Sequence, residues 1–490
     1  MYKKNDKAII TITDMTNEGE GVGKADGFAF FVKDTVIGDT VRIIVTKVKK
    51  TYGYGRLDEL ITPSPDRIKP ICPVSKQCGG CQIQSMSYDA QLKFKENKVR
   101  NNLIRIGGFD EKFIDEIRGD IIGADDPFYY RNKAQYPVGK DREGNIVTGF
   151  YAGRTHSIIN NTDCALGVKE NRPILELIID LMRRYGISAY DEKTVCGLVR
   201  HILLRKGFHT GQIMVCFVIN GDRLPKEDRI VADLTGLNKT LQKEYGSSIT
   251  SISLNMNKEN TNVIMGRETR ILYGPDHIED TLLGLRFDIS PLSFYQVNPV
   301  QVEKLYGLAI EYAGIKENEE VWDICCGIGT ITLAMAKKAF RVHGIEIVKE
   351  AIEDARKNAE RNGIDNSEFI CAPAEEYLPE NADSIKADVI VMDPPRKGMD
   401  ERSLEAVLKV SPSRIVYVSC DSATLARDLK YLCARGYTLE KYRPVDMFPQ
   451  TVHCEVVVSL GKNFEKPKDY IQVGIDAEDY YRIKNSDKEE

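Results

Sequence analysis

The stretch that decides the fold runs Asp323-Ile-Cys-Cys-Gly-Ile-Gly-Thr330. It ends a predicted strand, Val321–Ile324, and leads into a predicted helix, Thr330–Lys338. Gly327 and Gly329 let the backbone turn tightly and allow a ligand to approach it closely. A glycine turn after a strand is also common as a purely structural feature, so this turn alone leaves both interpretations open.

An acidic residue on the next predicted strand favours the ligand-binding interpretation. The strand Val342–Glu346 ends about 20 residues beyond the turn in a carboxylate that suits the ribose hydroxyls of a nucleoside. The turn lacks the third glycine of the dinucleotide fingerprint. A nucleoside without phosphate groups, such as S-adenosylmethionine, therefore fits better than a dinucleotide.

The same alternation of strands and helices continues over residues 286–462. This pattern predicts an α/β domain with a doubly wound, Rossmann-like parallel sheet. Ligands bind such sheets at the carboxyl edge of the strands. Asp393-Pro-Pro-Arg-Lys-Gly398 follows one strand, and its two prolines stiffen the loop that carries the Asp393 carboxylate. We therefore expect Asp393 at the ligand edge, although a simple proline-rich turn capped by Asp has the same pattern.

The composition of the 490 residues is that of a globular protein, with 42% hydrophobic and 29% charged residues. No run of about 18 uncharged apolar residues is present to cross a membrane. The net charge of −5 argues against a protein that coats nucleic acid non-specifically. The polar N-terminus leads into no apolar signal-peptide core, so we expect a cytoplasmic protein whose 12 cysteines are reduced.

Residues 1–61 indicate a small β-barrel, with the glycine-rich stretch Asn17–Gly23 as a turn. The expected strands are Ala8–Thr13, Gly27–Val32, Thr40–Lys47 and Tyr54–Leu60. A basic run just before two tyrosines is how oligonucleotide-binding barrels hold RNA, but it also occurs at solvated strand ends. The residues concerned are Lys47, Lys49, Lys50, Tyr52 and Tyr54.

Residues 62–285 begin with a proline-rich linker and are interpreted as a central α+β domain. Within them, Tyr88–Ile106 has helical spacing and carries five basic residues, so we expect a helix with a basic outer face. A second, amphipathic helix is expected at Arg172–Tyr185. Residues 463–490 form a polar, acidic tail.

Two residues of the α/β domain suit covalent catalysis. Cys420 lies between the strand Ile415–Val418 and a helix, whose N-terminus would lower the pKa of the thiol. Glu455 precedes three valines, where burial raises the pKa of a carboxyl and makes it a proton acceptor near neutral pH. The alternatives are an inert strand-end cysteine and a charge that keeps a strand edge soluble.

A thiolate and a base together fit methyl transfer to carbon 5 of a pyrimidine. Carbon 5 is a poor nucleophile until a thiolate adds at carbon 6. The proton left on carbon 5 must then be removed before the cysteine departs. Cys420 and Glu455 supply both functions, whereas methylation of ring nitrogens needs no covalent nucleophile.

The chain resembles the RNA uracil-5-methyltransferases, specifically the 23S rRNA branch with a TRAM barrel and an iron–sulfur cluster. The resemblance covers residues 1 to 460 and includes Tyr130–Lys133 in the central domain. In the α/β domain it is carried by Ser293–Asn298, Asp323–Thr330, Gly344–Ile347, Asp393–Lys397, Tyr417–Asp428 and His453–Glu455.

The resemblance implies a class I methyltransferase domain that uses S-adenosylmethionine. Gln296, Glu346 and Asp393 match cofactor-contacting positions, and Asp393 contacts the cofactor, reads the uracil edge, or does both. Cys325 also matches such a position, where relatives usually have an aromatic residue. Cys420 matches the nucleophile, and Glu455 matches the base.

The implied substrate is 23S rRNA, as a single-stranded or refolded loop that contains the target uridine, and the protein is expected to act as a monomer. One alternative is the same chemistry on tRNA, against which the barrel and the cysteines argue. A cytosine-5-methyltransferase is excluded because the loop at Asp393 lacks a Pro-Cys pair. A third alternative is an iron–sulfur RNA-binding factor with an inactive methyltransferase domain, against which Cys420 and Glu455 argue.

A cysteine cluster lies near the start of the central domain. Cys72-x5-Cys78-x2-Cys81 supplies three closely spaced thiolates, which suit zinc or an iron–sulfur cluster equally well. The resemblance adds Cys164 as the distant fourth ligand and favours a [4Fe–4S] cluster. The spacing that leaves an open iron for radical chemistry is absent.

Overall fold

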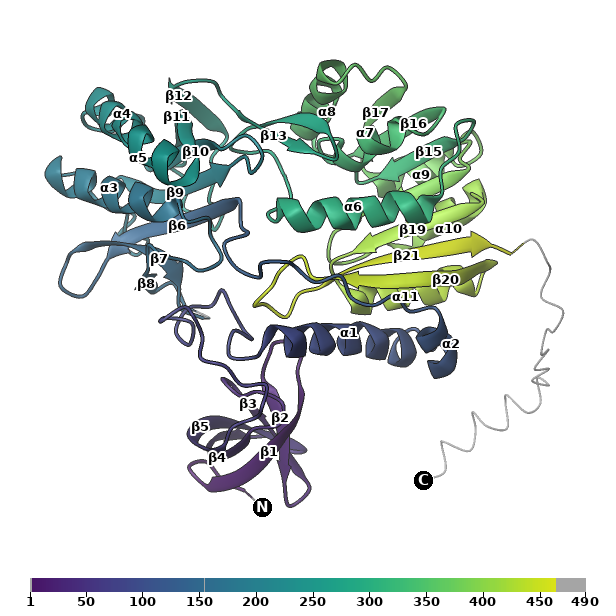
Figure 1. Cartoon of the computed structure of the whole chain (residues 1–490), viewed down its shortest axis with the longest axis horizontal. Coiled ribbons are helices and arrows are strands. Elements are labelled where there is room, and N and C mark those ends of the chain that lie inside the picture. The colour runs from purple at the N-terminus through teal and green to yellow at the C-terminus, as the bar shows by residue number, and fades with distance from the viewer. Residues whose placement is uncertain (1, 154, 464–490) are drawn as a thin grey trace, which may run out of the picture.

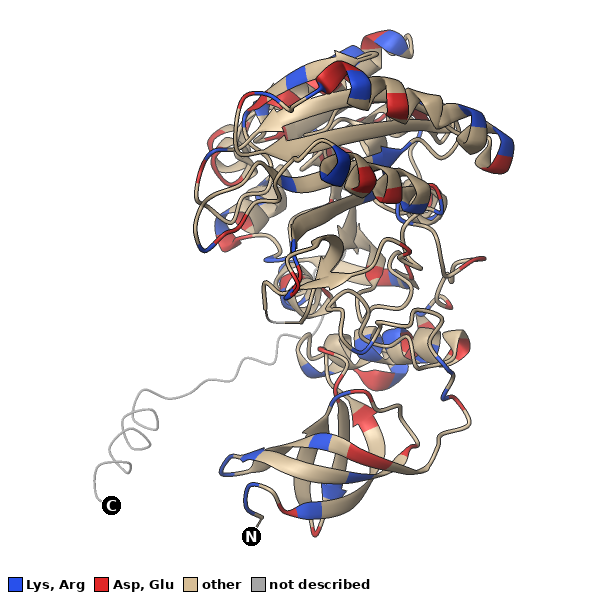
Figure 2. Cartoon of the chain, turned by 90° about the vertical axis from the view of Figure 1, so that its left-hand side faces the viewer, with Lys and Arg blue, Asp and Glu red and all other residues tan. Residues whose placement is uncertain are grey.

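The structure, a computed structural model, describes residues 2–153 and 155–463. Figure 1 shows a barrel at the bottom, a central sheet at the upper left and a larger α/β sheet at the right. The tail expected at residues 463–490 lies outside the described residues beyond Asn463. Figure 2 shows acidic and basic residues interspersed along the chain.

Five strands close into the expected N-terminal barrel, in the order β1-β2-β3-β5-β4. The glycine-rich stretch expected as a turn instead contains a strand, β2. Its glycines are required by close packing, because a Cβ at Gly21 would lie 2.2 Å from Oγ1 of Thr35. The bounds are β1 (Lys7–Met15), β2 (Gly21–Ala25), β3 (Phe28–Val32), β4 (Thr40–Val48) and β5 (Tyr52–Thr62).

The central sheet has seven strands in the order β12-β11-β10-β9-β6-β7-β8. All its neighbouring strands are antiparallel except β10 and β11. The amphipathic pattern at 172–185 forms α3, which packs with α4 and α5 on this sheet. The bounds are β6 (Lys133–Lys140), β7 (Ile146–Tyr151), β8 (Ile158–Asn160), α3 (Asn171–Arg184), β9 (Val199–Lys206), β10 (Gln212–Ile219), α4 (Glu227–Gly236), α5 (Asn238–Tyr245), β11 (Ser248–Met256) and β12 (Glu268–Tyr273).

A hairpin, β13 (Ile278–Leu282) and β14 (Leu285–Ile289), joins the central sheet to the α/β domain. Its apolar residues share one core with Leu203 and Met214 of the central sheet and with Val302 and Leu305 of helix α6. The hairpin thus spans the position, residue 285, at which the sequence pattern changes.

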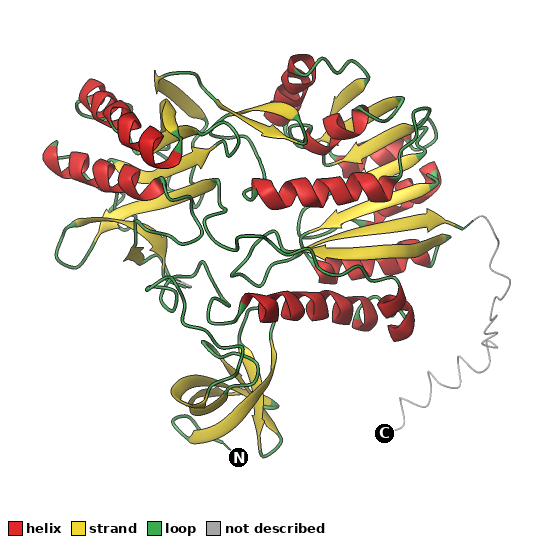
Figure 3. Ribbon diagram, in the orientation of Figure 1, coloured by secondary structure: helices red, strands yellow, loops and turns green. Residues whose placement is uncertain are grey.

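The α/β domain contains a seven-stranded sheet in the order β17-β16-β15-β18-β19-β21-β20. The expectation of a purely parallel sheet is wrong at one end, because β21 runs antiparallel to β19 and β20. No helix intervenes between β20 and β21 to return the chain, so the two strands pair antiparallel. Helices flank both faces of the sheet (Figure 3), as in a doubly wound fold.

The strands of this domain are β15 (Glu320–Ile324), β16 (Arg341–Glu346), β17 (Ser367–Cys371), β18 (Val389–Met392), β19 (Arg414–Ser419), β20 (Tyr437–Val445) and β21 (Glu455–Lys462). Three helices share a core on one face: α6 (Pro299–Ala313), α7 (Thr330–Ala336) and α8 (Lys349–Arg361). Three others lie on the opposite face: α9 (Ala374–Asn381), α10 (Glu401–Val410) and α11 (Ser422–Cys433).

Helix α1 (Tyr88–Arg105), followed by α2 (Glu111–Glu116), belongs to the α/β domain by packing although it precedes the central sheet in sequence. Val99 and Leu103 share a core with residues of α11, and Figure 1 shows α1 below β20. The expected basic outer face is wrong at Lys95, which is fully buried. Its ammonium lies 2.5 Å from the carboxylate of Asp446 and also donates to the carbonyl of Phe448.

No helix within residues 2–153 and 155–463 is both long and apolar enough to cross a membrane.

The first prediction concerns this buried ion pair. We expect Lys95→Met to destabilise the protein by about 3–5 kcal/mol, because it leaves the Asp446 carboxylate buried without its partner. Urea unfolding measures the loss. Lys93→Met, a change at an exposed lysine of the same helix, is the matched control and should leave stability within about 0.5 kcal/mol of the parent. Equal stability of the two variants would contradict the role given to the pair.

Candidate functional site

A pocket opens at the carboxyl edge of the α/β sheet, between β15, the start of α7 and the segment before α6. Of the expected cofactor residues, Gln296, Cys325 and Asp393 line it. The other lining residues are Leu282, Phe294, Tyr295, Tyr306, Asp323, Cys326, Gly327, Ile328, Thr330 and Ile331. The pocket therefore lies where open α/β sheets bind ligands.

The glycine loop has the geometry that the sequence predicted. Gly327 and Gly329 have φ values of 56° and 84°, and a Cβ at Gly327 would meet no atom within 4 Å. Glu346 lies beside this loop rather than in the pocket lining. Its carboxylate accepts hydrogen bonds from the backbone N–H of Gly327 at 3.2 Å and of Val348 at 2.9 Å. The loop and the carboxylate are thus held together.

Two buried polar atoms of residues that line the pocket have no hydrogen-bond partner: Oδ1 of Asp323 and the hydroxyl of Tyr295. The other oxygen of Asp323 accepts a 2.5 Å hydrogen bond from Thr332. Buried polar atoms are usually paired, so these two indicate a polar ligand. A nucleoside that carries amino and carboxylate groups, such as S-adenosylmethionine, fits them.

The antiparallel direction of β21 brings Glu455 to the same edge. A strand that runs opposite to its neighbours begins where they end, and Ser419 at the end of β19 pairs with Val456. Cys420, which follows Ser419, therefore lies near Glu455. The charges of Glu455 and Asp393 both raise the pKa of the Cys420 thiol, so the three side chains share one electrostatic environment.

Burial sets the protonation of this group. It raises the pKa of Glu455 far above the usual carboxyl range, with the charge of Asp393 adding to the effect. The pKa of Asp393 is raised for the same reason. Glu455 is 4% exposed. Both groups therefore retain protons at a pH where an exposed carboxyl would be ionised.

The expectation of a lowered thiol pKa is wrong for the free protein. Burial, together with the neighbouring carboxyls, raises the pKa of Cys420 to about 11. The helix N-terminus does not offset this, because the carboxylate of Asp421 accepts the N–H groups of Ala423 and Thr424 at the start of α11.

The sequence did not single out two further residues. Tyr306 on α6 is buried in the pocket, where it hydrogen-bonds Gln296 and Thr330. Asp428 on α11 is fully buried and accepts hydrogen bonds from the hydroxyl of Tyr417 at 2.6 Å and the N–H of Met399 at 2.9 Å. It thereby fixes the loop after Asp393. A charged residue at an apolar helical position is the signal that would have identified it.

Cys454 is buried in the core and its thiol donates to the carbonyl of Val445. Burial raises the pKa of this thiol to about 12. Cys454 thus lies among apolar side chains and does not line the pocket.

The four expected metal ligands, Cys72, Cys78, Cys81 and Cys164, line a single cavity of about 450 Å³ beside the central sheet. Among the described residues, no three of these sulfurs lie within 4.8 Å of one another. Three of the sulfurs face N–H donors, from Gly80 to Cys78, from Gln84 to Cys81 and from Asn161 to Cys72. Burial raises the pKa of the Cys81 thiol to about 12.

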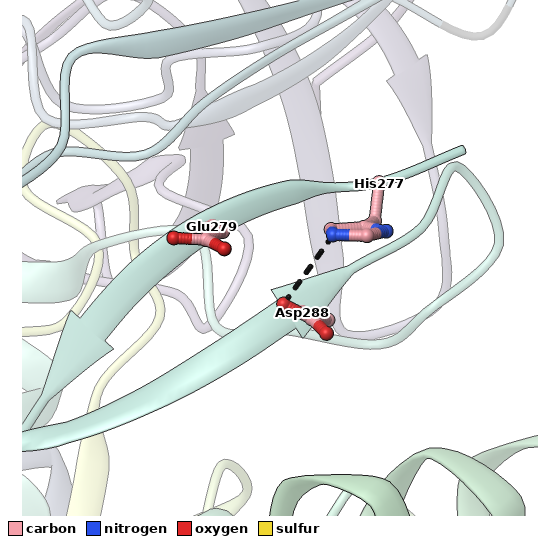
Figure 4. Close-up of side chains that lie close together, drawn as sticks. All are labelled: His277, Glu279 and Asp288. Carbon is pink, nitrogen blue, oxygen red and sulfur yellow. Dashed lines mark ion pairs between the residues drawn. The ribbon is translucent and has the colours of Figure 1, made fainter. Parts of the chain in front are cut away.

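A different cluster of metal-ligand types occurs on the β13–β14 hairpin, formed by His277, Glu279 and Asp288 (Figure 4). Arg361 from α8 forms ion pairs with both carboxylates. The guanidinium supplies the positive charge that the two acids require, so the cluster is a structural link between the hairpin and α8.

Comparison with known proteins places this geometry in a family. The family model "tRNA (Uracil-5-)-methyltransferase" matches residues 230–463, and the TRAM domain model matches residues 7–57. An RNA methyltransferase of Clostridium tetani is 44% identical over 95% of this chain and 98% of its own length. One from Halalkalibacterium halodurans is 45% identical over 93% of this chain and 97% of its own length.

A solved structure resembles nearly the whole chain. The Pyrococcus abyssi tRNA (uracil-54, C5)-methyltransferase, in complex with S-adenosyl-L-homocysteine, superposes with a TM-score of 0.73 at 29% identity. The match covers 93% of this chain and 100% of the other.

The fold and the pocket define a class I methyltransferase joined to a TRAM barrel. The chain belongs to the RNA uracil-5-methyltransferase family, whose members use S-adenosylmethionine. The family resemblance inferred from the motifs is thereby confirmed.

The second prediction follows from the burial of Glu455. A carboxyl whose pKa is raised by folding binds more protons in the folded state, so its ionisation lowers stability as pH rises above the unfolded value of about 4.3. We expect Glu455→Gln, which cannot ionise, to match the parent in melting temperature near about pH 5 and to exceed it near about pH 9. Differential scanning fluorimetry measures the shift.

The control is Glu376→Gln, a change at an exposed carboxylate on α9. It should follow the parent at both pH values. A Glu455→Gln protein that loses stability in parallel with the parent as pH rises would show that this carboxyl is not the group that ionises.

Proposed function

We propose that the protein methylates carbon 5 of a uridine in 23S rRNA through a covalent bond between Cys420 and the uracil ring. One observation carries the proposal, namely the gathering of Cys420, Glu455 and Asp393 at the sheet edge beside the pocket. The family supplies the reaction class, and the choice of 23S rRNA follows the motif resemblance to the rRNA branch.

Cys420 and Glu455 divide the chemistry. The Cys420 thiol releases its proton to solvent, and the thiolate adds to carbon 6 of uracil. Carbon 5 becomes enolate-like and takes the methyl group that S-adenosylmethionine would supply, which leaves S-adenosylhomocysteine. Glu455 in its ionised form then removes the proton from carbon 5, the bond between sulfur and carbon 6 breaks, and the thiolate is restored. A raised pKa suits Glu455 to accept a proton near neutral pH.

Asp393 has a role on the substrate side. Because burial raises the pKa of its carboxyl to about 7, the protonated form can donate a hydrogen bond to a uracil oxygen where negative charge develops as the thiolate adds. Gln296, Glu346 and Cys325 are assigned to the cofactor, together with the buried Asp323. The vacant hydrogen-bonding positions of Asp323 and Tyr295 support this assignment.

The barrel offers one RNA-binding surface. Lys47, Lys49 and Lys50 are exposed, and the rings of Phe31, Tyr52 and Tyr54 lie 5.2–5.7 Å apart beside them. Aromatic faces and cations side by side hold single-stranded RNA by stacking and charge. Arg396 and Lys397, exposed beside Asp393, suit a phosphate of the same strand.

A tRNA substrate is the second candidate, and the whole-length likeness to the Pyrococcus abyssi enzyme favours it. That enzyme has the same overall architecture, so the barrel does not distinguish between the two RNAs. Methylation assays on 23S rRNA and on total tRNA, followed by mapping of 5-methyluridine, decide between them. Labelled methyl groups confined to tRNA would overturn the 23S assignment and leave the chemistry intact.

We propose further that Cys72, Cys78, Cys81 and Cys164 hold a [4Fe–4S] cluster. A single zinc ion, with bonds of about 2.3 Å to each sulfur, requires sulfurs about 4 Å apart. The wider spacing and the cavity volume suit a larger group. The N–H donors that face three of the sulfurs are typical surroundings of cluster thiolates. Such a cluster would fix the linker against the central sheet.

The third prediction separates nucleophile from base. Cys420→Ala should abolish both methylation and any RNA adduct, because carbon 5 is never activated. Glu455→Gln should still add and methylate but should stall before elimination, and therefore accumulate a covalent, methylated RNA adduct. Methyl-labelled S-adenosylmethionine measures methylation, and denaturing gels of end-labelled RNA measure the covalent adduct.

Cys454→Ala is the matched cysteine control and should keep the adduct and most of the activity. Adduct formation by Cys420→Ala would refute the nucleophile assignment. Normal turnover by Glu455→Gln would refute the base assignment.

The fourth prediction concerns the cluster. Protein purified without oxygen should be brown, with broad absorption at roughly 400 nm. Serine at any of the four cysteines should reduce bound iron, whereas Cys371→Ser, at an exposed cysteine elsewhere, should not. Iron and zinc analysis of each variant measures this. One equivalent of zinc in place of iron would exclude the cluster.

A further inference from the structure

A second large cleft lies in the central domain, outside the methyltransferase pocket. It encloses about 990 Å³, with an adjoining branch of about 450 Å³. Its walls come from the end of β6 and the turn after it, Tyr151 at the end of β7, residues 156–159, the 188–197 segment and the start of β9. A cleft of this size accommodates a nucleotide or a comparable ligand, and none of the roles proposed above uses it.

Aromatic rings and a guanidinium line the cleft. The rings of Tyr151 and His156 stack with their centroids 5.2 Å apart. The guanidinium of Arg200, another lining residue, lies over the ring of Tyr190 at 4.6 Å. Flat aromatic and guanidinium surfaces of this kind are what proteins use to stack unpaired RNA bases.

Two buried polar atoms of residues that line the cleft lack partners. They are Nε of Arg200 and Nδ1 of His201, in side chains that are 6% and 7% exposed. Burial lowers the pKa of His201 to about 4, so the ring is neutral near neutral pH and offers one donor and one acceptor. Unsatisfied buried groups are rare in native proteins, so these two indicate a polar ligand.

The charges of the cleft identify which part of a nucleotide it suits. The imidazole of His156 lies 2.6 Å from the carboxylate of Glu192. The acidic lining residues Asp141, Glu143, Asp191 and Glu192 are balanced by the basic lining residues Lys140, Arg142, Lys193 and Arg200. The cleft therefore has no excess of positive charge to favour a free phosphate or a nucleoside triphosphate. Its flat aromatic and guanidinium surfaces fit the base.

The cleft also adjoins the cysteine cavity, which reaches the segment that carries Gln296. Tyr151 and His201 line both the cleft and the cavity that holds the four cysteines. The same cavity reaches Val297, the neighbour of Gln296 in the methyltransferase pocket. The carbonyl of Tyr151 accepts a hydrogen bond from the N–H of Gly79 in the cysteine loop, which fixes this wall.

We propose that this cleft binds one unstacked base of the RNA substrate, at a position other than the target uridine. The inference rests on the proposed function and adds a specificity site to it. The base stacks on the rings of Tyr151 and His156. The polar edge of the base forms hydrogen bonds with the unpaired nitrogen atoms of Arg200 and His201. Holding a second base fixes the strand relative to Cys420, so the enzyme reads its substrate at two points.

The test combines changes in the protein and in the RNA. RNA oligonucleotides that the enzyme methylates are made with a single abasic site at each position around the target, and their affinities are measured by fluorescence anisotropy. The parent should show one position outside the target where loss of the base weakens binding about tenfold, as expected for a lost base stack.

Tyr151→Leu with His156→Ala should bind the intact RNA about tenfold more weakly than the parent and should be insensitive to the abasic site at that position. Its melting temperature and its affinity for S-adenosylmethionine should match those of the parent. The matched control is Tyr273→Leu with His209→Ala, which changes one tyrosine and one histidine of the central domain outside the cleft. It should behave as the parent with every oligonucleotide.

Each alternative outcome is distinct. Parental affinity in the Tyr151→Leu, His156→Ala variant, or equal sensitivity of variant and parent to every abasic site, overturns the base-binding cleft while methylation stays intact. Absence of carbon 5 methylation on any RNA overturns the proposed function, and the cleft proposal with it.

Discussion

The segment between β20 and β21, residues 446–452, is the constraint on which the assembly of the three parts depends. The buried ion pair of Lys95 and Asp446 fixes its start to α1. Its backbone carbonyls accept hydrogen bonds from Tyr130 of the central domain, from Asn298 before α6 and from Gln82 in the cysteine loop. Val452 at its end shares a core with Met15 and Val36 of the barrel. This short loop thus contacts the barrel, the central domain and the α/β domain, and it leads directly to Glu455 at the start of β21.

The position of Glu455 at the start of β21 explains the raised pKa values in the site. β21 begins at the edge where the parallel strands end, so Glu455 lies near Asp393 and Cys420. The side chain of Glu455 is buried there and has little contact with water. Desolvation raises the pKa of all three groups. A site of this kind costs stability when its groups ionise. Asp428 holds the neighbouring loop with neutral and charged hydrogen bonds, so the arrangement is rigid.

Two cavities of the central region adjoin each other. Tyr151 and His201 line both the cysteine cavity and the cleft. Val297 of the cysteine cavity directly follows Gln296 of the methyltransferase pocket in the sequence.

The sequence by itself determined the class of domain, the barrel, the ligand edge and three residues of the pocket there, Gln296, Cys325 and Asp393, because strand periodicity, glycine turns and local motifs depend on neighbours in the chain. It also pointed to Cys420 and Glu455 and grouped the cysteines. Tertiary structure alone decided the antiparallel direction of β21, the burial of Lys95 and the packing of α1 on the α/β domain. It also reversed the expected pKa of Cys420, because the thiol is buried and two carboxyls lie nearby. These features depend on which distant segments exclude water from a side chain, and desolvation by residues more than 300 positions away leaves no local pattern, as Lys95 and Asp446 show.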